Sequence, residues 1–595
     1  MFSFFNEKPV KEEPKKSCQE NIVSVYKIPI HYDGNKKRIQ YSIIENLELD
    51  TTIYNTLCNN NSSKICKTFI RILSEYYTND KIFLKDTQKS IHMMNTKIEY
   101  CSFENTDTIV SFLDDIVNDD YFVEKYMYVD MDCLSFLNEN EAFMKFYSFL
   151  NISSPVFALL SPLLVCITPF VILKINNVSI TYSTYIKILG EIIQSKVFGK
   201  VILTEEGLRF EDKLYAIVCV LMYIYHIYQN IQKCIKYYDN IAVIHTHIEE
   251  IQKFLSTTIP MMKISLSERS YYKSDCYTLY YKEMENHIPV LEQLQDTIQS
   301  IKPFEMTTRE ALQLGVLYKT FYTIYSNKTI HTSLYYALGY NGYMVILNEI
   351  YKNVDQKLLS DVTFYKKKKG GKGSKGDKKN EYSIHFKDIL YPALIHQTDC
   401  VKNEVTMDKN MILSGVNASG KTTMLKSIFI NIILSQQIGM GSFSYFLCQP
   451  YDYLHCYINI IDTSDRYSLF QSECNKCQEI IQSIQENPNK KHFCVFDEIF
   501  SGTTPDEAVK CGYGFLTYLN SNPNVRFILT THFMELCKKF SDNGIENYKM
   551  ISSIQDDTLL HKYKIEKGIN DIQGSIEILR QLNFPKEIIT SISSL

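Results

Sequence analysis

The chain has 595 residues, of which 45% are hydrophobic, so it is long and apolar enough to form several packed domains. Its formal net charge of −4 excludes a general electrostatic attraction to nucleic acid, and any such binding has to come from local patches. Its 17 cysteines include one C-x-x-C pair, Cys474 and Cys477, which lies in a helical pattern. This indicates reduced thiols rather than a zinc site, and we expect a reducing compartment of the cytoplasmic or nuclear type.

The N-terminal part of the sequence divides by pattern into three segments. Residues 1–22 are polar and predict a disordered tail. Residues 23–110 mix short apolar groups with turn-like and helical patterns. Residues 111–363 are mainly helical in pattern, and the long polar faces of the later helices are typical of arms that stand off a body or of ordinary surface helices.

Two stretches in the helical region, residues 154–175 and 213–231, are nearly free of charge. Each is about long enough to cross a bilayer, so one interpretation is a membrane hairpin. The alternative is a pair of buried helices in the core of a large helical domain. Pro155, Pro162 and Pro169 favour this alternative, because proline breaks or kinks a helix, although membrane-spanning helices tolerate it better than soluble ones.

A boundary follows at residues 364–381, which are rich in lysine and glycine and show no periodicity. Such a composition predicts a flexible tether, with residues 382–595 as the next domain. The lysines are typical of a solvated linker, and the alternative is that they contact a phosphate backbone.

A phosphate-binding loop is predicted at Gly415–Thr422, which has the pattern G-x-x-x-x-G-K-[ST]. The apolar run Met411–Leu413 before it predicts a buried strand, and Thr423–Gln436 after it has helical spacing. The two glycines let backbone amides surround phosphates, Lys421 reaches the β- and γ-phosphates, and the Thr422 hydroxyl is a Mg²⁺ ligand. The candidate nucleotide-binding residues are Gly415, Asn417, Ala418, Ser419, Gly420, Lys421, Thr422 and Thr423.

Two later apolar strands end in polar groups that suit an ATPase. Phe493–Glu498 ends in two acids, of which Asp497 would hold Mg²⁺ and Glu498 would act as the general base on water. Phe527–His532 repeats this form, and we expect it to deliver His532 to the same edge of the sheet, where His532 would sense the γ-phosphate.

The C-terminal region carries six motifs in order over about 200 residues. They are Ile412–Thr423 with Asn417 after the first glycine, Gln437-Ile438-Gly439, Ser468-Leu469-Phe470-Gln471-Ser472-Glu473, Asp497–Thr504, Thr531–Leu536, and the closing segment from Tyr563 to Ile589. This set resembles the motifs of the DNA mismatch repair MutS family. Upstream, residues 46–57 are similar to the start of the MutS core, and residues 337–343 fall where its lever returns to the ATPase. The likeness is greatest with the MutS-like proteins of large DNA viruses.

The resemblance implies an α/β ABC-type P-loop ATPase domain at the C-terminus, preceded by a large, mainly α-helical core and lever region. It implies ATP and Mg²⁺ as cofactors, DNA as a partner, and a homodimer in which Ser468 of one chain completes the catalytic site of the other. In the family, the adenine contact comes from the strand region that corresponds to residues 400–403 here, where no aromatic residue stands.

Two departures from the family pattern affect these expectations. No Phe-x-Glu motif like that of the family's mismatch reader stands in a suitable setting near the N-terminus, so we expect branched or otherwise structured DNA rather than mismatches as the target. In the D-loop, Phe500-Ser501-Gly502 replaces the usual Gly-Arg-Gly, which is expected to alter communication across the dimer.

A different class of function stays open at this point: a membrane-associated or scaffold ATPase that uses the same nucleotide site without recognising DNA. The solubility of the protein without detergent and the salt dependence of any DNA binding discriminate between the two classes, since real phosphate contacts weaken steeply with salt. A transporter subunit ranks below both, because no Leu-Ser-Gly-Gly-Gln signature is present.

Overall fold

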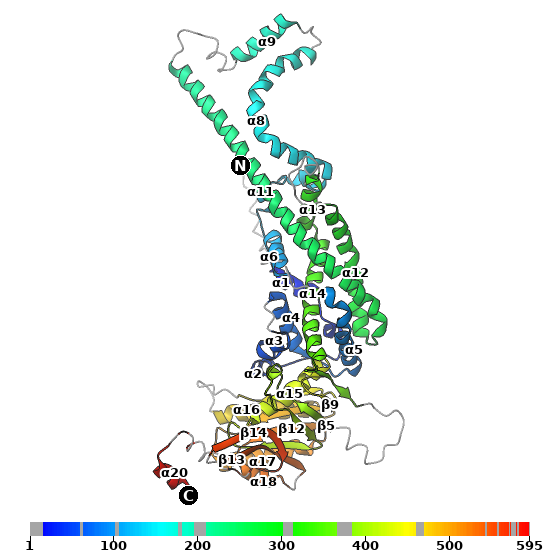
Figure 1. The fold of residues 1–595 in the computed structure, drawn as a ribbon, viewed down its shortest axis with the longest axis vertical. Coiled ribbons are helices and arrows are strands. Elements are labelled where there is room, and N and C mark those ends of the chain that lie inside the picture. The colour runs from blue at the N-terminus through cyan, green and yellow to red at the C-terminus, as the bar shows by residue number, and fades with distance from the viewer. Residues whose placement is uncertain are drawn as a thin grey trace, which may run out of the picture. The chain divides into compact units, whose positions relative to one another are not determined.

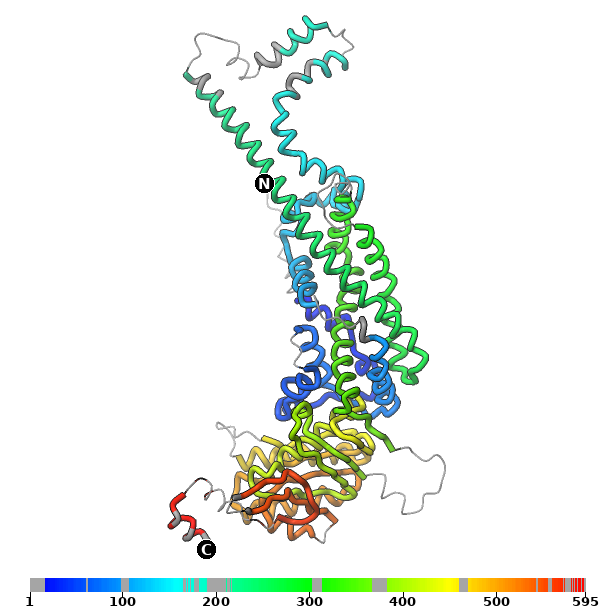
Figure 2. The backbone as a smooth tube through the Cα atoms, in the orientation of Figure 1, coloured from blue at the N-terminus to red at the C-terminus, as the bar shows by residue number. Residues whose placement is uncertain are grey.

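The computed structural model describes residues 16–59, 63–100, 106–175, 181–195, 210–301, 313–365, 383–459, 469–541, 544–555, 558–570, 572, 579, 582 and 584–593. The chain divides into two compact units, which we describe separately. Unit 1 comprises Met1–Cys18, Thr108–Ser256 and Pro289–Leu334, and unit 2 comprises Gln19–Asp107, Thr257–Ile288 and Tyr335–Leu595. Figure 1 labels the elements, and Figure 2 traces the same backbone, with the C-terminal part of unit 2 in yellow to red.

The main sheet of unit 2 has six strands in the order β10-β11-β12-β7-β13-β14. The strands are β7 (Asn410–Ser414), β10 (Tyr453–Tyr457), β11 (His492–Asp497), β12 (Val525–Thr531), β13 (Ile545–Gln555) and β14 (Thr558–Lys567). All neighbours are parallel except β13 and β14, which form an antiparallel pair. The central strands are apolar on both faces, as expected for parallel strands that are covered on both sides.

Helices cover both faces of this sheet. On one face α15 (Lys421–Gln437) packs against β11, where Phe429 and Phe493 stack with ring centroids 6.0 Å apart. On the other face α16 (Leu469–Glu486), α17 (Pro505–Ser521) and α18 (Met534–Lys539) share one apolar core with Cys494 and Phe496. The predicted α/β class of the C-terminal region is therefore confirmed at the level of a mixed sheet between helices (Figure 1).

A second sheet of unit 2 corrects the predicted domain boundary at residue 382. Its order is β4-β9-β5-β6, and β4 (Thr363–Phe364) pairs in parallel with β9 (Tyr445–Cys448). β5 (Ile384–Ile389) and β6 (Asn403–Met407) form an antiparallel pair in the same sheet. β3 (Ser360–Asp361) also pairs with β8 (Met440–Gly441). The domain thus begins before the predicted tether, because two-residue strands are too short to show an alternating pattern.

The N-terminal segment of unit 2 packs on the C-terminal end of α15 instead of forming a separate part. Its elements are α1 (Cys18–Val25), β1 (Lys37–Arg38), α2 (Tyr41–Asn46), α3 (Tyr54–Leu57), α4 (Lys64–Glu75), β2 (Tyr76–Tyr77) and α5 (Lys81–His92). The Tyr54 hydroxyl donates to Gln437 Oε1 over 2.7 Å, and Gln437 Nε2 donates to the carbonyls of Leu73 and Ser74. The predicted tail of residues 1–22 also ends earlier, since α1 begins at Cys18 and buries Ile22.

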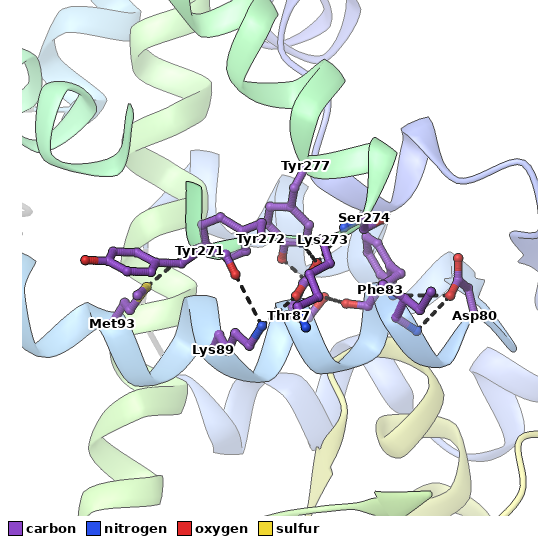
Figure 3. Close-up of polar contacts among 12 residues, drawn as sticks. Asp80, Phe83, Thr87, Lys89, Met93, Tyr271, Tyr272, Lys273, Ser274 and Tyr277 are labelled. Atoms are coloured by element: carbon purple, nitrogen blue, oxygen red, sulfur yellow. Dashed lines mark hydrogen bonds and ion pairs between the residues drawn. The ribbon is translucent and has the colours of Figure 1, made fainter. Parts of the chain in front are cut away.

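Within unit 2, α5 is joined to the start of α12 (Asp275–Gln299) by a polar network (Figure 3). The buried carboxylate of Asp86 accepts hydrogen bonds from the backbone N–H groups of Lys273 and Ser274, over 2.6 and 2.7 Å. On the same face the Tyr277 hydroxyl donates to Thr87 Oγ1. Because a buried carboxylate is stable only with such donors, this network fixes the position at which α12 begins.

Unit 1 is built from helices. They are α6 (Thr106–Val117), α7 (Phe122–Lys125), α8 (Glu141–Ile175), α9 (Tyr182–Ser195), α13 (Leu314–Ser326) and the unit 1 parts of α11 (Phe210–Ser267), α12 and α14 (Lys328–Asp355). α8 continues through all three of its prolines, so the expectation that they break it is wrong, and Figure 1 shows the ribbon bending instead. A proline removes one hydrogen bond and kinks a helix without always ending it.

The two apolar stretches lie in α8 and α11. Among the described residues, one segment is long and apolar enough to cross a membrane by length and composition. It is Glu141–Leu163 in α8, and few of its residues are buried. Residues 213–231 form the early part of the 58-residue helix α11 and do not pass the same test within the described part of the chain. The expectation that both stretches form a buried pair is wrong, because many of their large side chains are exposed.

Candidate active site

The phosphate-binding loop stands between β7 and α15, so the predicted strand and helix on either side of it are confirmed. Gly420 caps the helix with φ +94°, a left-handed conformation that favours glycine. A Cβ at Gly415 would lie 2.7 Å from Ser419 Oγ, so this position has no room for a side chain. Ser419 Oγ is itself buried, with no hydrogen-bond partner among the residues that the structure describes.

The two predicted metal ligands are in contact. Thr422 Oγ1 donates to both carboxylate oxygens of Asp497, at 3.1 and 3.0 Å, although the two residues are far apart in sequence. β11 and β12 are neighbours, and the Thr530 hydroxyl from the end of β12 donates to Asp497 as well. Three oxygen-bearing side chains therefore meet at the carboxyl edge of the parallel strands, which is where open α/β sheets bind ligands.

Glu498 lies between Lys421, the lysine predicted to bind phosphate, and His532, the predicted sensor. Glu498 Oε1 is 3.6 Å from Lys421 Nζ, and Glu498 Oε2 is 3.6 Å from His532 Nδ1. Lys421 is 5% exposed and donates to the carbonyls of Gly415 and Val416. The contact with His532 and the charge of Lys421 hold the pKa of the Glu498 carboxyl below its ordinary value, although partial burial acts the other way.

This arrangement predicts a shifted pH profile for His532→Ala. A base with a depressed pKa stays ionised further into the acid range, and loses its function only as the pH falls through that depressed value. Without His532 the pKa of Glu498 rises, so we expect the acid limb of the kcat–pH profile to move to higher pH. The control is His226→Ala, which removes an exposed histidine of unit 1. An unchanged acid limb in His532→Ala would contradict the assignment of Glu498 as the titrating base.

A cavity of about 680 Å³ adjoins these groups, a size suited to a small-molecule cofactor. It brings together most of the predicted loop residues and Glu498. The residues that line it are Ile389, Leu390, Tyr391, Leu394, Gln397, Asp399, Cys400, Val401, Asn403, Asn417, Ala418, Gly420, Lys421, Thr422, Thr423, Met424, Ser427, Glu498, Met550 and Tyr563. Gly415, Ser419, Asp497 and His532 are not in the lining, and Ser468 lies outside the described residues.

Two aromatic residues line this cavity, Tyr391 and Tyr563, and neither was among the predicted site residues. The Tyr563 ring lies against the loop, since a Cβ at Gly420 would be 3.1 Å from it. Asn403 holds Tyr563 in place by donating to its carbonyl over 3.0 Å and accepting from the N–H of Ile565. Cys400, Val401 and Asn403 also line the cavity, and the Tyr563 ring beside them comes from β14, to which no spacing rule points.

The residues present fit a magnesium nucleotide. In the loop, Gly415 leaves no space for a Cβ, so backbone amides can approach a phosphate closely. The buried Ser419 hydroxyl is available to bond a ligand, and the buried Lys421 supplies a positive charge. Thr422 and Asp497 offer the hydroxyl and carboxylate oxygens that Mg²⁺ prefers. The apolar and aromatic side of the cavity suits a nucleobase.

Comparison with known proteins agrees with these motifs. The sequence profile of MutS domain V matches residues 411–595. The chain is 29% identical over 205 residues to a DNA mismatch repair protein MutS of Fusobacterium nucleatum, which covers 34% of this chain and 22% of that protein. It is 28% identical over 218 residues to an Endonuclease MutS2 of Lactococcus lactis, covering 34% and 26% of the two chains.

A mitochondrial DNA mismatch repair protein mutS homolog of Sarcophyton glaucum is 26% identical over 214 residues, which is 35% of this chain and 21% of that protein. The chain thus matches about a quarter of the length of these curated relatives. The special likeness to viral proteins stays a prediction. Residues 411–595 thus match domain V of the MutS family, and the resemblance that the motifs predict is confirmed for this part of the chain.

Proposed function

We propose that this protein is a Mg²⁺-dependent ATPase of the MutS type, which couples ATP binding and hydrolysis at a composite dimer site to the binding of DNA. The observation that carries the proposal is the contact of the Thr422 hydroxyl with Asp497, beside Lys421 and Glu498. In this arrangement Thr422 and Asp497 hold the metal ion, which supplies charge neutralisation at the phosphates.

The roles of the other residues follow from their positions. Lys421 and the loop amides bind the phosphates, and the Tyr563 and Tyr391 rings are placed to pack on the base. Glu498, ionised through its contacts with His532 and Lys421, accepts a proton from the attacking water. His532 is 46% exposed and lies at the same edge of the sheet, where it donates a hydrogen bond towards the terminal phosphate.

Ser468 of a second copy completes the site in this proposal. It directly precedes α16. A hydroxyl at the start of a helix stabilises developing negative charge when the two chains close around the nucleotide. DNA is the proposed partner because relatives of the C-terminal part are DNA mismatch repair proteins, and branched or structured DNA is the proposed target because the chain lacks the mismatch-reading motif.

The test is an ATPase assay of the purified full chain with Mg²⁺, run alone and with homoduplex, mismatched, forked and four-way-junction DNA. We expect turnover that structured DNA changes by several-fold, and DNA affinity that falls steeply as salt rises. If the protein shows no ATP affinity and no turnover in the presence of Mg²⁺, the proposed ATPase activity is refuted. Turnover without DNA affinity at any salt concentration would refute the DNA-coupled function alone.

A further inference from the structure

Glu473 is a buried carboxylate outside the nucleotide cavity. It lies in the early turns of α16 and closes the Ser-x-Phe-x-x-Glu motif, and it is 2% exposed. Its Oε1 accepts hydrogen bonds from the N–H and the hydroxyl of Ser501, over 3.0 and 2.9 Å. Its Oε2 accepts from the N–H of Gly502, over 3.2 Å. All three donors come from the turn that follows β11, so this one carboxylate joins α16 to that turn.

The same turn begins with the proposed general base. Glu498 has φ 52° and Phe500 has φ 59°, and both are non-glycine residues in the left-handed region. Such conformations persist only where the surrounding structure holds them, and they gather at functional sites. The conformation of residues 498–502 is therefore imposed by contacts, and a loss of those contacts lets the turn relax.

Contacts hold the turn at its start, in its middle and at its far end. At the start, the N–H of Glu498 donates to the carbonyl of Thr530 over 3.0 Å. In the middle, Phe500 is buried and its ring packs on Phe515, with centroids 6.2 Å apart. At the far end stand the three hydrogen bonds to Glu473 and a close approach of Gly502, where a Cβ would be 2.8 Å from the backbone nitrogen of Phe470 in α16.

We propose that Glu473 is a positioning residue for the ATPase. It fixes the strained turn to the early turns of α16 and so keeps the Glu498 carboxylate beside Lys421 and His532. A displacement of α16 is then carried to the general base through two short links, from Glu473 to Ser501 and from Ser501 back to Glu498. This inference rests on the proposed function, because it takes Glu498 as the base.

The Ser501 hydroxyl is the side-chain donor in the link between Glu473 and the turn, and the other two donors are backbone N–H groups. Ser501 is exposed, so its replacement leaves the packing of the core unchanged. It therefore allows the link to be weakened by one hydrogen bond without opening a cavity.

The test compares Ser501→Ala, Ser501→Thr and Glu473→Gln with the parent chain in kcat, ATP dissociation constant and melting temperature. We expect kcat to fall about threefold in Ser501→Ala and about tenfold in Glu473→Gln, since the loss of a typical hydrogen bond corresponds to a factor of about two to ten. We expect ATP affinity to stay within about twofold, because none of these side chains lines the cavity. Ser501→Thr keeps the hydroxyl and should restore the parental kcat.

Glu479→Gln is the matched control, because its carboxylate stands on the same helix, is 65% exposed and pairs only with Lys476 among the described residues. Parental kcat in both Ser501→Ala and Glu473→Gln would overturn the proposal, and so would a Ser501→Thr that behaves like Ser501→Ala. Equal losses of kcat and ATP affinity would also overturn it. If Glu473→Gln fails to fold, the Ser501 pair decides the question. A parent chain that neither binds nor hydrolyses ATP refutes the proposed function instead.

Discussion

Replacing Lys421 with alanine is expected to abolish ATP binding and, with it, turnover. The lysine is almost completely buried and is the first residue of α15. Its ammonium group lies between the carbonyls of Gly415 and Val416 and the carboxylate of Glu498. The lysine would bond the β- and γ-phosphates, and charge-assisted hydrogen bonds are worth about 1.5–3 kcal/mol each, so losing two of them corresponds to a loss of affinity of roughly 10²- to 10⁴-fold. Titration calorimetry with a slowly hydrolysed ATP analogue measures this loss directly.

Lys426→Ala provides the control for the Lys421 variant. Lys426 stands on the same helix and carries the same charge, but it does not line the cavity. We expect it to bind ATP like the parent chain, within about twofold. Both variants should fold, because Glu498 is only half-buried and keeps its contact with His532 when Lys421 is absent. If Lys421→Ala binds ATP as tightly as Lys426→Ala does, the loop is not the phosphate site.

The centre of the site was predictable because its signals are local. Gly415 and Gly420 have backbone or packing requirements that only glycine meets, and these are visible in the sequence as fixed spacing. The strand β11 is apolar from Phe493 to Phe496 and ends at Asp497, which Glu498 follows directly, so the position of both acids at the sheet edge followed from this pattern. Parallel neighbours then brought Thr530 and Asp497 together, as strands that end at the same edge must do.

What the sequence could not predict depends on contacts between distant segments. Tyr563 reaches the loop only because β14 turns back on β13 and Asn403 holds its backbone. Glu473 reads as a polar residue of an amphipathic helix, and only the fold shows that it is buried against the turn after β11. The periodicity of a sequence reports the helix or strand in which a residue lies, and it does not report which distant segment that residue contacts.

The length of the helices could not be predicted for a related reason. Residues 213–231 and the more polar residues that follow them belong to one helix, α11, whose environment changes along its length. A change from apolar to polar composition looks like a boundary between elements, yet a long helix can pass from one compact unit into the other, as α11 does at Ser256. Composition reports the surroundings of a segment, whereas the continuity of a helix depends on its backbone hydrogen bonds.

Replacing Glu498 with glutamine is expected to leave ATP bound but almost unhydrolysed. Glutamine keeps the shape of the side chain but cannot accept a proton from water, and loss of a positioned general base lowers kcat by about 10²- to 10⁴-fold. Lys421 loses its partner at 3.6 Å and is free to bond phosphate, so affinity should hold or rise. Single-turnover hydrolysis measures the chemical step, and sedimentation with and without ATP shows whether the bound nucleotide accumulates a closed dimer.

Glu535→Gln makes the same chemical change on α18, where the carboxylate is 63% exposed and pairs with Lys539, and it should hydrolyse ATP at the parental rate. If Glu498→Gln also hydrolyses ATP at that rate, another group near the cavity takes the proton. His532 is the nearest candidate, since its ring nitrogen lies 3.6 Å from the Glu498 carboxylate.

The His532→Ala variant distinguishes Glu498 from His532 as the base. With Glu498 as the base, that variant loses the hydrogen bond to the terminal phosphate but keeps measurable turnover, and its acid limb moves to higher pH. With histidine as the base, turnover itself is lost at every pH, because no histidine stands among the described residues that line the cavity and could replace His532.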